Sequence, residues 1–173
     1  MRALITSAGV RLGRATGPSA AQAGFDLTLH VHRSGRAEAV AAEARALGRR
    51  VEILQADLSS AEDCARLAAE ALASGPLDAL VNNAALYERR ALAGDHLGGV
   101  GADAAVNTRA PFLLIQAPRP ALAQSTLTGG AVVNIGDIGG ERPRAGLRRS
   151  TAFRRDPHAH PLLGRGARPR GCG

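Results

Sequence analysis

Short, continuous apolar runs alternate with helix-like stretches along most of this chain, and this alternation limits the folds open to it most strongly. Five runs read as strands, at residues 2–6, 25–32, 50–58, 77–85 and 129–136. Helical composition fills most of the space between them, at 12–23, 35–48, 60–75 and 102–117. Strands buried on both faces lack the alternation of apolar and polar residues that a half-exposed strand shows. The pattern therefore predicts an α/β fold with a doubly wound parallel sheet.

Three places depart from regular helix composition. Pro18 lies inside the first helical stretch, which we expect to be kinked or split near residue 17. Residues 92–103 are rich in glycine and are expected to be weakly structured. Pro111 is expected inside the last predicted helix. Ser60, by contrast, is a good N-cap for the helix that follows it.

The positive charge is concentrated at the end of the sequence. The net charge is +7, and residues 147–173 hold seven Arg and one acidic residue, so +6 of it lies there. This segment has no helix or strand periodicity. We therefore divide the chain into a domain at 1–146 and an Arg/Pro/Gly-rich tail at 147–173 that is expected to be disordered. Phe153 is the one aromatic residue of the tail, so base stacking is poorly supplied and nucleic acid is not expected as a partner.

The two cysteines and the short apolar runs argue against a metal-binding, redox-active or membrane-spanning protein. Cys64 and Cys172 have neither metal-ligand nor redox spacing, so no metal site is expected. The apolar runs are all shorter than a membrane span, and the first strand begins at residue 2 without a signal peptide. We therefore expect a cytoplasmic protein.

Ligands of such sheets bind beyond the carboxyl ends of the strands. After the first strand, Gly9 and Gly13 lead into a helix whose amides can hold a phosphate, beside Arg11 and Arg14. An ordinary strand-to-helix turn is the alternative.

The second strand ends in a basic segment. An acidic residue there would bind a ribose 2′-hydroxyl, whereas a 2′-phosphate suits the residues that stand there, which are His32, Arg33, Ser34 and Arg36. A solvated basic turn is the alternative, and the phosphate interpretation is favoured because of the glycine turn before it.

Polar residues also follow the later strands. Asp57 can accept a hydrogen bond from an adenine amine or simply start a helix, and Asn82 and Asn83 can tie loops together or form a turn. Asp137 follows the fifth strand. Asn107 lies among apolar neighbours in a helical stretch, which favours a buried, hydrogen-bonded side chain over a surface one.

Together these motifs resemble the short-chain dehydrogenase/reductase family, and most of all its pteridine-reductase-like branch. The resemblance covers residues 1 to about 146 and rests on TSAGVRLG, HVHRS, ADLS, NNAA, VNTRAPFLLIQ and VVNIGD. In that branch an Arg replaces the middle glycine of the first motif, as Arg11 does here, whereas Ser7 departs from its first glycine. The resemblance implies a Rossmann-like sheet of order 3-2-1-4-5, truncated after about the fifth strand.

The resemblance also implies a cofactor and a reaction. The cofactor is NADPH, with NADP preferred over NAD, and the reaction is reduction of a carbonyl or pterin-like small molecule. Relatives commonly form homo-oligomers. The positions that match the family's cofactor site are Thr6, Gly9, Arg11, Leu12, Gly13, His32, Arg33, Ser34, Asp57, Leu58, Asn83 and Ala84.

The catalytic positions match only in part. Asn107 matches the family's proton-relay Asn, and Asp137 matches its Ser/Asp position. The family's catalytic Tyr and Lys fall on Ser150 and Arg154, and the chain contains no Lys. A Ser hydroxyl is a far weaker acid than Tyr, whose pKa is ~10, and Arg stays charged.

We therefore expect impaired catalysis, and a non-catalytic NADP(H)-binding protein is the alternative. The change of composition at residue 147 favours either an out-of-frame reading of the coding sequence or a degraded gene end as the origin of the tail, and resequencing tests this.

Overall fold

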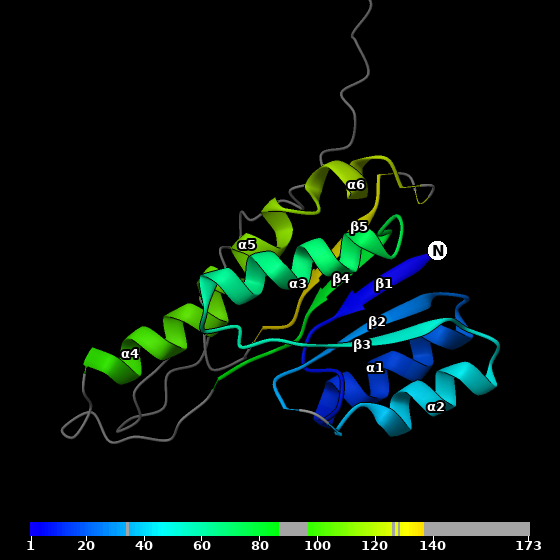
Figure 1. The fold of residues 1–173 in the computed structure, drawn as a ribbon, viewed down its shortest axis with the longest axis horizontal. Coiled ribbons are helices and arrows are strands. Elements are labelled where there is room, and N and C mark those ends of the chain that lie inside the picture. Colours follow the sequence, from blue (N-terminus) through cyan, green and yellow to red (C-terminus); the bar gives the residue numbers. More distant parts are fainter. Residues whose placement is uncertain (34, 87–96, 126, 128, 137–173) are drawn as a thin grey trace, which may run out of the picture.

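The computed structural model describes residues 1–33, 35–86, 97–125, 127 and 129–136. A single five-stranded sheet with the order β3-β2-β1-β4-β5 forms its centre (Figure 1). The strands are β1 (Arg2–Ile5), β2 (Asp26–Val31), β3 (Val51–Gln55), β4 (Ala79–Asn82) and β5 (Ala131–Asn134). Every neighbouring pair is parallel. The predicted fold class and strand order are therefore confirmed. Ser34 and the tail at 147–173 lie outside the described residues.

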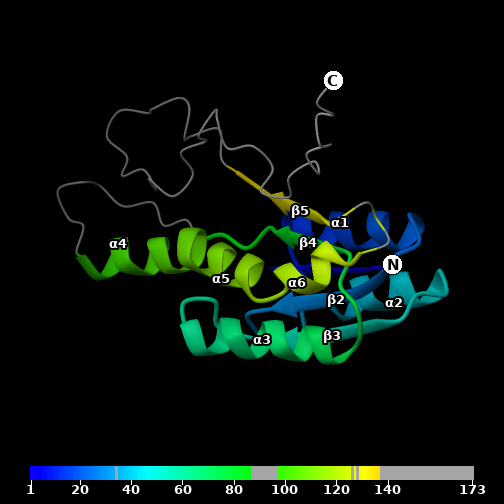
Figure 2. The same ribbon diagram turned by 90° about the horizontal axis from the view of Figure 1, so that it is seen from above.

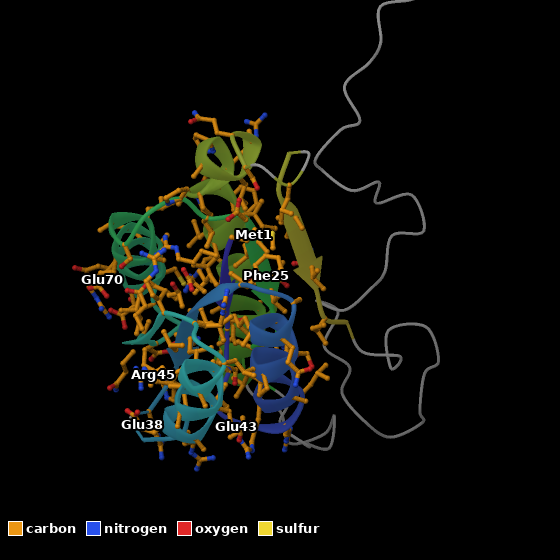
Figure 3. All side chains as sticks on the ribbon, turned by 90° about the vertical axis from the view of Figure 1, so that its right-hand side faces the viewer. Met1, Phe25, Glu38, Glu43, Arg45 and Glu70 are labelled. Carbon is orange, nitrogen blue, oxygen red and sulfur yellow. The ribbon has the colours of Figure 1, made fainter. Side chains whose placement is uncertain are left out.

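Helices cover both faces of this sheet (Figures 1 and 2). One face carries α1 (Arg11–Gln22) and α2 (Glu38–Ala46), and the other carries α3 (Ala61–Ala73), α5 (Ala110–Gln116) and α6 (Arg119–Ala123). Figure 3 looks along the layers, with the charged residues Glu38, Glu43 and Arg45 of α2 at the outer surface. Within the described part of the chain, no helix is long and apolar enough to cross a membrane.

Successive residues of β1 pack into two separate hydrophobic cores, one on each face of the sheet. Leu4 packs with Leu67, Leu80 and Leu114 on the α3–α5 side. Its neighbour Ile5 packs with β2, α1 and α2 on the opposite side. Both side chains are at most 1% exposed. A strand needs apolar residues in succession when both of its faces are covered, which is why the run is continuous.

Of the two outcomes predicted for the first helix, a kink or a split near residue 17, the split is wrong, because α1 continues past Pro18. Proline removes one helical hydrogen bond. Tertiary packing outweighs that loss, because Gly17 is buried against Val40 of α2 and a Cβ at residue 17 would overlap the Val40 side chain. The pair Gly17–Pro18 therefore belongs to the packing of α1 on α2 and does not interrupt the helix.

The region before α5 is also more regular than predicted. Helix α4 (Leu97–Ala104) occupies part of the stretch expected to be weakly structured, while 92–96 lies outside the described residues. A five-residue π-helical turn, η2 (Ala105–Arg109), joins α4 to α5. Pro111 is the second residue of α5 and, because α4, η2 and α5 follow one another without a break, it lies inside a helical stretch, as predicted. Since proline has no N–H, it cannot give the carbonyl of Asn107 its usual α-helical bond, and the π-helical turn η2 includes that residue.

Candidate functional site

The carboxyl ends of β1 and β4 are joined by a compact hydrogen-bond clamp. The Oγ1 of Thr6 accepts from the backbone N–H groups of Asn83 and Ala84, both at 2.9 Å. In return the Nδ2 of Asn83 donates to the carbonyls of Thr6 at 2.9 Å and Ser7 at 3.2 Å. Thr6 is 1% exposed. Thr6 and Asn83 thus fix the backbone around the site through the Thr6 hydroxyl and the Asn83 amide nitrogen.

The turn after β1 packs backbone against backbone. A Cβ at Gly13 would overlap the Ser7 carbonyl and come within 2.7 Å of Asn83 Nδ2. A Cβ at Gly9 would lie 2.6 Å from the Arg36 carbonyl. Both positions therefore require glycine, which keeps the chain close to the strand ends.

The start of α1 faces this turn. The N-cap residue Val10 has an extended backbone and offers no side-chain acceptor to the first-turn amides. Helix N-terminal amides carry partial positive charge and bind anions. The glycine turn and the uncapped helix start together fit a phosphate group.

Two residues of this turn adopt a backbone conformation that is rare for side-chain-bearing residues. Ser7 has φ +53° and Arg11 has φ +48°. Only glycine adopts this left-handed region without steric penalty. The backbone therefore explains why the resembled motif has glycine at these two positions, and Ser7 and Arg11 adopt the same conformation at a steric cost.

Basic side chains surround the turn. Arg11, Arg33 and Arg36 are exposed, as is His32. Arg14 is held by Glu43 of α2 at 3.1 Å. Exposed guanidinium groups beside a helix start favour a multiply charged anion.

The segment after β3 forms the neighbouring wall. The Oδ1 of Asp57 accepts from the Ser59 hydroxyl at 2.7 Å and the Ser59 N–H at 2.8 Å. These bonds lower the pKa of Asp57, so its carboxylate is charged at neutral pH. His32 Nδ1 lies 4.0 Å from the same oxygen.

Leu58, in contrast, has its side chain in the core, so only its backbone remains for a ligand. The Leu12 side chain is 51% exposed.

Asn107 is buried and hydrogen-bonded, as its apolar neighbours predicted. Its Oδ1 accepts from the Leu86 N–H and its Nδ2 donates to the Leu86 carbonyl, both at 2.8 Å. These bonds fasten the segment after β4 to η2.

Asp137, Ser150 and Arg154 lie outside the described residues. Within the described ranges, no group of three or more His, Cys, Asp or Glu side chains could hold a metal ion.

Sequence reasoning missed two polar contacts at this edge of the sheet. His30 of β2 is 1% exposed and contacts both the β1 turn and the segment after β3. Asn134 of β5 accepts a hydrogen bond from Asn82 of β4 at 2.8 Å. The available signals were a histidine between two apolar residues of β2 and an Asn as the last residue of both β4 and β5.

Known proteins share this arrangement. The family model described as short chain dehydrogenase matches residues 1–149. An uncharacterized oxidoreductase of Mycobacterium tuberculosis is 34% identical over 146 residues, which are 84% of this chain and 55% of that protein.

Two solved structures superimpose closely. A short chain dehydrogenase of Burkholderia cenocepacia in complex with NADP gives a TM-score of 0.80 at 30% identity, covering 88% of this chain and 61% of that one. A metagenomic short-chain oxidoreductase in complex with NADP gives 0.81 at 28% identity, covering 89% and 69%.

The chain spans about half the length of its curated relatives: 55% of the M. tuberculosis protein and 54% of an L-rhamnose 1-dehydrogenase from Sphingomonas. The family match nevertheless includes every described strand together with the glycine turn and the Thr6–Asn83 clamp. The chain therefore belongs to the short-chain dehydrogenase family.

Proposed function

We propose that this chain binds NADP(H) at the carboxyl edge of its sheet. The observation that carries the proposal is the glycine turn at the start of α1, where Gly9 and Gly13 leave no room for a Cβ. The dinucleotide pyrophosphate lies at this turn, bound by the first-turn amides of α1. Arg33 and His32 bind the 2′-phosphate, with Ser34 as a third candidate from the sequence. The relatives that carry NADP in their solved structures support this placement.

The other candidate positions have distinct roles in this proposal. Asp57 accepts from the adenine amine, and Leu58 and Ala84 contribute backbone to the walls. Asn83 and Thr6 act indirectly by holding the strand ends. Arg11 adds positive charge beside the turn, and Leu12 covers the cofactor with its exposed side chain.

NADPH supplies a hydride when it is bound, and the whole protein is proposed to be a reductase of the pteridine-reductase-like branch. Its substrate would be a small carbonyl or pterin-like molecule, and it would act as a homo-oligomer in the cytoplasm. Asn107 and Asp137 are the candidate relay and substrate-orienting residues. Support for the branch comes from Arg11 in the glycine motif and from the His32–Arg33–Ser34 segment.

Catalysis by this chain is proposed to be impaired. The family match ends at residue 149, one residue before Ser150. Ser150 and Arg154 cannot replace a Tyr proton donor and the Lys that tunes it. The chain would then act as an NADP(H)-binding protein without hydride transfer.

The test measures the affinity of the purified full chain for NADPH, by NADPH fluorescence or by calorimetry. The affinity for NADH is the comparison. We expect NADPH to bind at least about tenfold more tightly than NADH, because a charge-assisted phosphate contact contributes about 1.5–3 kcal/mol. Arg33→Glu should remove this preference. Arg119→Glu, an equal charge change on the exposed surface of α6, should leave it intact.

A second pair of variants tests the turn itself. Gly13→Ala should abolish binding of both nucleotides, since the new Cβ overlaps the Ser7 carbonyl. Gly101→Ala in α4 places its Cβ in open space and serves as the control. Equal binding by both variants would contradict the site.

Turnover separates the reductase from the binding protein. NADPH oxidation with carbonyl and pterin substrates is expected to stay at the background rate even when NADPH binds. Turnover at a rate ordinary for enzymes, about 1 per second or more, would show that the chain does not need the Tyr–Lys pair.

A further inference from the structure

His30 occupies an unusual place for a titratable side chain. It lies in β2 between Leu29 and Val31, and it is 1% exposed. Its Nδ1 accepts a hydrogen bond from the Ser7 N–H at 3.1 Å, and its Nε2 lies 3.1 Å from the Ala56 carbonyl. An N–H only donates and a carbonyl only accepts. The proton of the neutral ring is therefore on Nε2, and Nδ1 carries the free electron pair.

The ring joins two walls of the proposed cofactor site. Ser7 begins the phosphate-binding turn at φ +53°. The His30 backbone also holds this turn, because the Ala8 N–H donates to the His30 carbonyl at 3.0 Å. Ala56 directly precedes Asp57, the candidate adenine contact. One imidazole thus sets the distance between the pyrophosphate turn and the adenine wall.

We propose that His30 is a positioning residue for NADP(H), and that protonation of its Nδ1 weakens cofactor binding by releasing the Ser7 turn. This inference rests on the proposed function. A proton on Nδ1 would face the Ser7 N–H donor directly, so the bond must break and the turn must move. Because His30 is 1% exposed, its effect on the cofactor would pass through this turn.

The surroundings of the ring determine the direction of the effect. Burial lowers the pKa of His30, and the neighbouring His32 lowers it further. The hydrogen bond to the Ala56 carbonyl and the charge of Asp63 on α3 act in the opposite direction. From the β1 turn and from the end of β3, the partners of the ring are backbone groups. The ring is therefore neutral at pH 7, and its effect on binding begins only at acidic pH.

Binding as a function of pH is the first test. The affinity for NADPH is measured between about pH 8 and pH 5 for the full chain, for His30→Asn and for His30→Gln. Asn keeps a polar atom near the Nδ1 position, and Gln keeps one near the Nε2 position, but neither titrates. NADPH has a 2′-phosphate that itself titrates near about pH 6, and the variants share that contribution. We expect the unmodified chain to lose about fivefold to tenfold more affinity over this range than either variant.

A spectroscopic test requires neither a variant nor a nucleotide. The His30 ring signal and the Ser7 amide signal are followed by NMR as the pH falls, and they should titrate with one midpoint. Equal pH slopes in all three proteins, or a Ser7 amide that ignores the His30 titration, would overturn the inference while leaving the cofactor site standing. Absence of NADPH binding at every pH would overturn the proposed function as well as the nucleotide part of this inference.

Discussion

Thr6 and Asn83 exchange hydrogen bonds in both directions across the ends of β1 and β4. Thr6 Oγ1 accepts from the Asn83 N–H at 2.9 Å, and Asn83 Nδ2 returns a bond of 2.9 Å to the Thr6 carbonyl. The same hydroxyl also accepts from the Ala84 N–H. One small side chain thus satisfies two backbone donors at the point where the candidate cofactor site begins.

Thr6→Val should lower the free energy of unfolding by about 2–4 kcal/mol, because two partly buried N–H groups lose their acceptor while the shape is kept. Thr6→Ser retains the hydroxyl and should lose less than about 1 kcal/mol. Urea unfolding of the two variants measures the difference. Equal losses would show that the methyl group contributes as much as the hydroxyl and would contradict the dominant role of the two hydrogen bonds.

Ser7→Gly should stabilise the chain by up to about 1 kcal/mol. Relief of the left-handed backbone at φ +53° contributes about 1–2 kcal/mol, and the greater freedom of glycine in the unfolded chain offsets part of it. Ser7→Ala keeps a Cβ at the same φ and should give no gain. Thermal melts of both variants test this, and a gain with alanine would assign the effect to the lost hydroxyl instead.

Gly17→Ala should destabilise the chain by about 1–3 kcal/mol, although alanine is the better helix former. The new Cβ overlaps the Val40 side chain where α1 packs on α2. Val40→Ala opens that contact, so the double variant should recover most of the loss caused by the first substitution. A double-mutant cycle in urea measures the coupling. Additive effects would mean that the two helices move apart freely.

Asp78 joins the amino end of β1 to the segment after α6, because it accepts hydrogen bonds from Arg2 and Ser125. Acid should weaken this contact. Burial by itself raises the pKa of this carboxyl. The hydrogen bonds from the Ser125 hydroxyl at 2.5 Å and the Arg2 N–H at 2.7 Å outweigh burial, so the pKa is lowered overall. A carboxyl with a lowered folded-state pKa contributes stability above its unfolded value of about 3.9, and this stability is lost as the pH falls toward the folded value.

Asp78→Asn should therefore flatten the fall of unfolding free energy below about pH 4. Ser125→Ala removes one of the two hydrogen bonds and should flatten it in part. Urea midpoints between about pH 5 and pH 2.5 give the comparison. Parallel curves for the original chain and Asp78→Asn would show that other groups drive acid unfolding.

Features that depend on neighbouring residues could be predicted from the sequence. The continuous apolar runs predicted the parallel sheet, because each strand is buried on both faces and its pattern is local. Ser60 was predicted as an N-cap, and its Oγ accepts from the Asp63 N–H at 3.2 Å. Gly9 and Gly13 were predicted to lead into a helix start that can hold a phosphate, and both stand where the packing leaves no room for a Cβ.

Tertiary structure decided the features that depend on contacts distant in sequence. Helix α1 continues through Pro18 because Gly17 packs on Val40, and local propensity contains no information about that neighbour. The π-helical turn before Pro111 could not be read from composition either. His30 looked like one residue of an apolar strand, and its importance appeared only when folding placed Ser7 and Ala56 on its two ring nitrogens. The sequence by itself determined which elements form, whereas packing determined which of their polar atoms meet, because those pairs lie 23 to 77 residues apart in the chain.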